Sequence, residues 1–118
     1  FAHAIELQNN YSKKINHGEA VLMGMMMATK LSHLMKICNL KTLAQIKEIY
    51  KFNNLKYDIK KFFKKNEYSK IIGHMTNDKK NNDKKINLIL LKRIGQTTLP
   101  YSYKISTVEL KKIFNKVI

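Results

Sequence analysis

The sequence predicts a mainly helical domain with one small β-hairpin near its end. Apolar residues recur every three or four positions through most of the chain, which is the period of amphipathic helices, and a β-rich run follows only after residue 85. The 118 residues suit one compact domain, and an apolar share of 44% is ordinary for a globular protein. We therefore expect residues 1–118 to form one helical domain without a parallel sheet.

The first third of the chain predicts two helices joined by a loop. Residues 1–7 have the pattern of a helix end, and Asn9 and Asn10 begin a polar loop that continues to residue 14. Residues 18–37 are apolar on nearly every side, as is typical of a helix at the centre of a domain. We expect this second helix to be the core of the fold.

Shorter amphipathic helices are expected next. Thr42 and Gln45 match a capping box, which predicts a surface helix through about residue 52. Its expected apolar face comprises Leu43, Ile46, Ile49 and Tyr50. Asp58 is expected to cap a short helix through residue 63, and residues 67–75 predict another.

The last third predicts a loop, a hairpin and a final helix. Residues 77–85 are polar and charged, which indicates an exposed loop. Residues 86–94 predict a strand, 95–98 a turn and 99–105 a return strand, in which Pro100 favours an edge position. Ser106 and Glu109 then match a capping box for the closing helix.

The formal charge of +15 raises the question of nucleic-acid binding. Only Arg93 among the 23 basic residues is arginine, and the wealth of Lys, Asn and Ile indicates a compositional bias. Proteins that read bases or clamp phosphates use the planar fork of arginine, for which lysine is a poor substitute. We expect no nucleic-acid partner, and a basic helical nucleic-acid-binding module remains the alternative from another class.

Membrane insertion and disulfide formation are also disfavoured. The longest apolar stretch, residues 21–37, is interrupted by Lys30, Ser32 and His33 and is shorter than the ~20 residues that span a bilayer. A single cysteine, Cys38, excludes an internal disulfide, fits a cytoplasmic setting and is expected to be a small buried apolar residue. The opening FAHAIELQ lacks an initiator Met and a signal pattern, so we expect a cut inside a larger protein.

Histidines and carboxylates flank the first loop. His3 and Glu6 lie on the first helix, and His17, Gly18 and Glu19 stand at the mouth of the central helix. Two histidines with one carboxylate are a common ligand set for catalytic zinc, and the free N–H groups of a helix start suit a phosphate. By themselves, however, two histidines at this spacing are more often ordinary hydrogen-bonded residues.

The wider pattern resembles the 3-dehydroquinate synthase family. HAIE, a short loop and HGEAVLMGMMMATKLS are similar to the family's GHxxGHAxE and HGEAVxxGM motifs, with Ala2 where the family usually has glycine. The DKK run at 78–80, the INLILLKRIG strand and a final helix follow in the family's order, so the resemblance covers essentially the whole chain. It implies the C-terminal helical domain, separated from an N-terminal nucleotide-binding domain.

The resemblance also implies roles for individual residues. His17 matches a ligand of the catalytic metal, whereas His3 matches a histidine that faces the substrate and serves as a catalytic, hydrogen-bonding group. Lys80 matches the lysine that binds an acidic group of the substrate. Glu6 and Glu19 are expected to orient the two histidines by accepting hydrogen bonds from their imidazole N–H groups.

The activity implied is that of the complete enzyme. It would convert 3-deoxy-D-arabino-heptulosonate 7-phosphate to 3-dehydroquinate and phosphate in the shikimate route to aromatic amino acids, with zinc and NAD, as a cytoplasmic homodimer. The 118-residue chain alone is expected to be inactive and to bind neither cofactor tightly. A related sugar-phosphate cyclase or, more distantly, a metal-dependent alcohol dehydrogenase is the alternative enzyme, although the DKK run favours the synthase.

Overall fold

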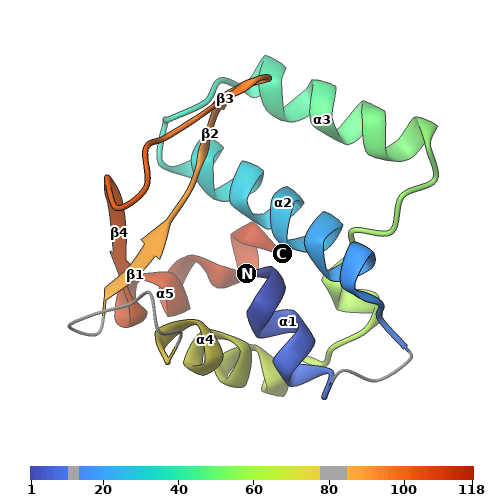
Figure 1. Ribbon diagram of the computed structural model, residues 1–118, viewed down its shortest axis with the longest axis vertical. Coiled ribbons are helices and arrows are strands. Elements are labelled where there is room, and N and C mark those ends of the chain that lie inside the picture. The colour runs from blue at the N-terminus through green and yellow to red at the C-terminus, as the bar shows by residue number, and fades with distance from the viewer. Residues whose placement is uncertain (11–13, 78–84) are drawn as a thin grey trace.

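The structure is a computed structural model that describes residues 1–10, 14–77 and 85–118 (Figure 1). It is mainly helical with small antiparallel sheets, which confirms the predicted fold class. In chain order the described elements are α1 (Ala2–Gln8), α2 (His17–Leu34), α3 (Leu40–Phe52), the 3-10 turns η1 (Ile59–Lys61) and η2 (Lys65–Glu67), α4 (Tyr68–Thr76), β1 (Lys85–Leu88), β2 (Leu91–Arg93), β3 (Gln96–Thr97), β4 (Tyr103–Ser106) and α5 (Thr107–Val117). Parts of two expected loops lie outside the described residues, namely Tyr11, Ser12 and Lys13 and the segment 78–84 with Lys80.

Helix α2 is the central element, as predicted. It contacts α1, α3, α5 and β2, and Met23, Met26 and Leu31 are fully buried within it. The helix ends three residues before the expected position because Lys36 adopts a left-handed conformation with φ +58°. The N–H of Ile37 then donates to the carbonyl of Ser32 over 2.8 Å and closes the helix end.

Helix α3 begins at a different cap from the one expected. The side chain of Asn39 accepts a hydrogen bond from the backbone N–H of Thr42 over 2.8 Å, so the prediction that Thr42 and Gln45 form the cap was wrong. Thr42 instead lies buried inside the first turn, and Ile49, expected on the apolar face, is 47% exposed. The side of α3 that faces α2 is therefore narrower than predicted.

The connection from α3 to α4 is made of single turns. Asp58 does cap the next element, accepting from the N–H of Lys60 over 3.1 Å, but that element is one 3-10 turn and not a helix through residue 63. Turn η2 leads directly into α4, which packs along α1. The amide of Gln8 at the end of α1 bonds both Glu67 and His74, over 3.1 and 3.3 Å, and so fixes α1 on α4.

The expected hairpin is divided into two small antiparallel sheets. Strand β1 pairs with β4, and β2 pairs with β3 across a turn in which Gly95 has φ +81°. Between the sheets, Leu90 and Thr98 are both buried and exchange two hydrogen bonds, one of which uses the Thr98 hydroxyl in place of backbone. Pro100 lies in the segment that leads to β4 and not within a strand, since it has no N–H for a ladder.

The hairpin is also attached to the central helix. The hydroxyl of Ser32 accepts from the backbone N–H of Leu91 over 2.9 Å and donates to the carbonyl of Ala28 over 2.7 Å. After β4, the Ser106 hydroxyl accepts from the N–H of Glu109 and caps α5, as predicted. Helix α5 returns to pack on α4 and α2, which completes the core.

Candidate active site

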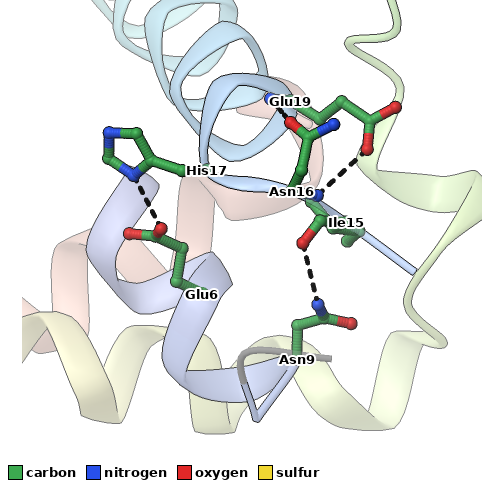
Figure 2. A network of polar contacts seen from close by, with 6 residues as sticks. All are labelled: Glu6, Asn9, Ile15, Asn16, His17 and Glu19. Carbon is green, nitrogen blue, oxygen red and sulfur yellow. Dashed lines mark hydrogen bonds and ion pairs between the residues drawn. The ribbon is translucent and has the colours of Figure 1, made fainter. Parts of the chain in front are cut away.

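The first turn of α2 is held by a reciprocal cap. The side chain of Asn16 accepts from the N–H of Glu19 over 2.8 Å, and the carboxylate of Glu19 accepts from the N–H of Asn16 over 3.1 Å (Figure 2). This arrangement satisfies two backbone donors at the helix start. It fixes the backbone at His17, the first residue of the helix.

The carboxylate of Glu6 reaches His17 from helix α1. Its Oε1 lies 2.7 Å from Nδ1 of the imidazole, and the Glu6 side chain is only 11% exposed, compared with 79% for His17. A carboxylate accepts, so Nδ1–H donates, and the tautomer that this hydrogen bond selects has its lone pair on Nε2. Figure 2 shows this second ring nitrogen turned away from Glu6. The pair therefore presents an oriented Nε2 at the surface.

The carboxylate of Glu19 contacts Asn16 and Lys56. Its Oε1 lies 2.9 Å from Nζ of Lys56, while its other oxygen bonds Asn16, so its described partners are the helix cap and the segment before η1. The Lys56 ammonium and then the N–H of Asn16 hold the pKa of Glu19 below its usual range. The stability that this carboxylate contributes is thus present at neutral pH and is lost only as the pH falls through the lowered pKa.

A side-chain hydrogen bond joins the residue after α1 to the residues just before α2. The amide nitrogen of Asn9, the residue after α1, donates to the carbonyl of Ile15 over 3.3 Å (Figure 2). Ile15 is buried, and Asn10, the residue after Asn9, adopts a left-handed conformation with φ +50°. These features hold the Glu6 helix and the His17 helix in one relative position.

His3 lies on α1 beside a surface cleft of about 300 Å³. The cleft runs between α1, α2 and β1, and its other lining residues include Phe1, Gly24, Met25 and Ile89. His3 is exposed and precedes Glu6 by one helical turn, so the two residues are neighbours on α1. The imidazole of His3 can therefore reach a molecule in the cleft.

Glycine is needed at position 24 because α1 crosses α2 there. A Cβ on Gly24 would lie 2.8 Å from the backbone nitrogen of Ala2 and 3.1 Å from its Cβ. This contact brings the start of α1, and with it His3, against the middle of α2. The HGEAVxxGM spacing thus has a packing function as well as supplying His17.

The donor set at His17 is suited to a metal but is incomplete in this part of the chain. Among the described residues, no group of three or more His, Cys, Asp or Glu side chains could hold a metal ion. The exposed Nε2 of His17, with a carboxylate behind it, has the arrangement that metal-binding histidines show. The arrangement at His17 thus fits the role of one metal ligand, and any further ligands would have to come from other residues.

Several residues around this site were missed by sequence reasoning. Asn16 was detectable, because Asn followed three residues later by Glu is a capping-box pattern immediately before the apolar helix. Asn9 and Lys56 gave no such signal, since their contacts join segments that only the fold brings together.

Within the part of the chain that the structure describes, no helix is long and apolar enough to cross a membrane.

Comparison with known proteins identifies similar sequences along the whole chain. The family profile described as 3-dehydroquinate synthase C-terminal matches residues 1–81. The 3-dehydroquinate synthase of Pelagibacter ubique (strain HTCC1062) is 46% identical over 110 residues, which cover 93% of this chain and 30% of that protein. The protein of the same name from Acinetobacter baumannii (strain SDF) is 30% identical over 116 residues, covering 98% of this chain and 31% of that protein. This chain therefore spans about a third of the length of these relatives.

Proposed function

The chain belongs to the family of 3-dehydroquinate synthase C-terminal domains, and from this we propose that the complete protein converts 3-deoxy-D-arabino-heptulosonate 7-phosphate to 3-dehydroquinate and phosphate. The similarity to proteins named 3-dehydroquinate synthase over 93% and 98% of the chain supports the reaction. The oriented Glu6–His17 pair at the start of α2 is the structural observation that carries the proposal.

His17 is proposed as the metal ligand that this chain contributes. Its Nε2 is exposed, and the hydrogen bond from Nδ1 to Glu6 holds the ring and its tautomer. A divalent metal such as zinc supplies Lewis-acid polarisation of an alcohol oxygen, which suits a reaction that begins at a carbinol. The task of Glu6 is to keep the imidazole in place before the metal arrives.

His3 is proposed to act on the substrate from the side of α1. It is exposed beside the cleft and next to Glu6 on the helix, so it can donate or accept a hydrogen bond, or move a proton, at a substrate oxygen. Glu19 has a positioning task, since its contacts with Asn16 and Lys56 hold the start of α2. Lys80, outside the described residues, is proposed to bind an acidic group of the substrate as a mobile point charge.

The remaining components are proposed to come from the N-terminal portion. The relatives are about three times as long as this chain, which leaves room for a nucleotide-binding domain that holds NAD and supplies the other metal ligands. Family resemblance supports a homodimer, and the lone, buried Cys38 is compatible with a cytoplasmic location.

The test is a comparison of full-length variants. His17→Ala should remove bound zinc and the release of phosphate from the heptulosonate phosphate while circular dichroism stays unchanged. His33→Ala is the matched control, because its imidazole contacts the carbonyl of Cys38 at the other end of α2. Zinc content and turnover that survive in His17→Ala would refute the assignment, and an active enzyme that converts only another sugar phosphate would identify a related cyclase.

A further inference from the structure

A second hollow, of about 480 Å³, lies between the end of α3 and the segment that leads to η1. It shares no described lining residue with the cleft beside His3. Small-molecule sites in proteins usually occupy ~300–1,000 Å³, so the hollow has the size of such a site. We call it the basic hollow, and its lining includes Tyr50, Lys51, Lys56, Tyr57, Asp58 and Lys61.

Two tyrosine rings form a fixed part of its wall. The buried Tyr50 donates its hydroxyl hydrogen to the carbonyl of Leu22 on α2 over 2.9 Å. The ring of Tyr57 meets the Tyr50 ring edge to face, with the centroids 5.4 Å apart and the planes at 78°. Rings held in this way are a preformed surface for another flat aromatic group.

The lysines that line the basic hollow are only partly neutralised. Nζ of Lys56 lies 2.9 Å from the carboxylate of Glu19 at the start of α2. Lys51 and Lys61 are exposed, and neither forms an ion pair with another described residue. These two ammonium groups therefore add positive charge that the described part of the chain leaves unpaired.

Further lysines surround Asp58, the carboxylate that lines the basic hollow. Lys30 of α2 is partly buried, and burial, followed by the charges of Lys47 and Lys60, lowers its pKa. Asp58 has the opposite effect on Lys30, and its Oδ1 also accepts a hydrogen bond from the backbone N–H of Lys60. Like charges gathered around one carboxylate repel each other, and a bound anion would relieve that repulsion.

We propose that the basic hollow binds an aromatic phosphate, that is, a flat ring that carries a phosphate monoester. Such a phosphate has a charge of about −1.5 to −2 at neutral pH, which the ammonium groups of Lys51 and Lys61 would balance. Lysine serves here as a mobile point charge, while Tyr57 and Tyr50 offer the surface for the ring. A nucleotide and a simpler aryl phosphate share this chemistry. The inference does not rest on the proposed reaction.

Lysine acetylation in the full-length protein tests the proposal. The rates at which Lys51 and Lys61 react with acetic anhydride are followed by peptide mass spectrometry. Lys112 and Lys116, exposed on α5, are the controls. The added compounds are phenyl phosphate, adenosine monophosphate and inorganic phosphate. Because the readout is specific to each lysine, binding of these compounds elsewhere in the protein does not affect it.

Phenyl phosphate should slow the acetylation of Lys51 and Lys61 and leave the two control lysines unchanged. It should act at concentrations at least about tenfold lower than inorganic phosphate, because only the aryl compound can use the tyrosine rings. If adenosine monophosphate acts at a lower concentration than phenyl phosphate, the natural ligand class is a nucleotide. If it acts only at a higher one, the class is a simpler aryl phosphate.

Tyr57→Leu should remove the roughly tenfold advantage of phenyl phosphate over inorganic phosphate. Phe52→Leu is the matched control, because Phe52 is 87% exposed and follows Lys51 directly but does not line the basic hollow. Equal protection by phenyl phosphate and inorganic phosphate in the unaltered protein would overturn the proposal, as would equal protection of Lys112. Lys51 and Lys61 that resist acetylation without any added compound would show that the hollow is covered, which would overturn it too.

Discussion

The backbone nitrogen of Ala2 lies 2.8 Å from the position that a Cβ would take on Gly24. Helices α1 and α2 therefore meet backbone to backbone at this crossing, which is closer than any side chain on residue 24 allows. The contact places His3, one residue after Ala2, on the cleft formed with α2. The geometry of the candidate site thus depends on the absence of one methyl group.

Gly24→Ala should destabilise the domain, whereas Gly73→Ala should stabilise it. Alanine is better than glycine within a helix by about 1 kcal/mol, but at position 24 the new methyl group would overlap Ala2, and overpacking costs ~1–3 kcal/mol. Position 73 in α4 has no atom within 4 Å of the added Cβ, so only the gain applies. Urea unfolding of both variants measures the difference, and equal stabilities would contradict the close approach.

Glu6→Gln should weaken zinc binding by about tenfold in the full-length protein, since losing a partner behind a metal-bound histidine typically costs 10–100-fold. The amide keeps the shape of the side chain but lacks the charge that stabilises the Nδ1–H donor of His17. Glu19→Gln is the control, because Glu19 contacts Asn16 and Lys56 instead. Competition with a chelator gives both affinities. A similar loss in the two variants would show that Glu6 acts only through the stability of the helices.

The helical fold was largely predictable because its strongest signals are local. The apolar period of α2, the Ser106 cap of α5 and the Asp58 cap all act within a few residues, and each was found. The cap of α3 was a local error, since Asn39 and not Thr42 holds the start of that helix. The error in the hairpin arose where contacts between distant segments decide the structure. The hairpin is divided where Leu91 bonds Ser32 of α2, a contact across 59 residues that no local pattern reveals.

The candidate site was predictable in its residue types but not in its pairings. In the sequence, Glu6 and Glu19 were equivalent as carboxylates near histidines. Only the fold shows that Glu6 contacts His17 and that Glu19 contacts Lys56. Met25 looked like one more core methionine within its helix, yet it is 55% exposed. A sequence shows that a helix is apolar all round, but not which of its sides the fold leaves exposed.

Lys80→Ala should raise KM for the heptulosonate phosphate and lower kcat/KM, while Lys84→Ala in the same run should change neither beyond small surface-charge effects. Both lysines lie in the polar segment before β1, so the pair isolates the specific position from the background of positive charge. Steady-state kinetics of the two full-length variants provide the comparison. Equal behaviour would mean that the DKK similarity does not identify the substrate lysine.

The isolated 118-residue chain should fold but should show no dehydroquinate synthase activity, no measurable NAD binding and at best weak zinc affinity. Its core is continuous within the described residues: α2 packs on α1, α3 and α5, and residues such as Ile5, Met23, Ile71 and Leu110 are fully buried. Apolar burial of this kind does not depend on any further domain.

Catalysis should fail because the described residues hold no three-ligand metal cluster, and one histidine cannot reproduce a three-ligand zinc site. Circular dichroism, calorimetric titration with zinc and with NAD, and a phosphate-release assay on the isolated chain test each part separately. The exposed side chains of Met25, Ile89 and Tyr101 predict poor solubility as well. Met25→Lys should improve the solubility, because the Met25 side chain is already more than half exposed. Tight NAD binding or turnover by the isolated chain would show that the catalytic machinery does not depend on an N-terminal domain.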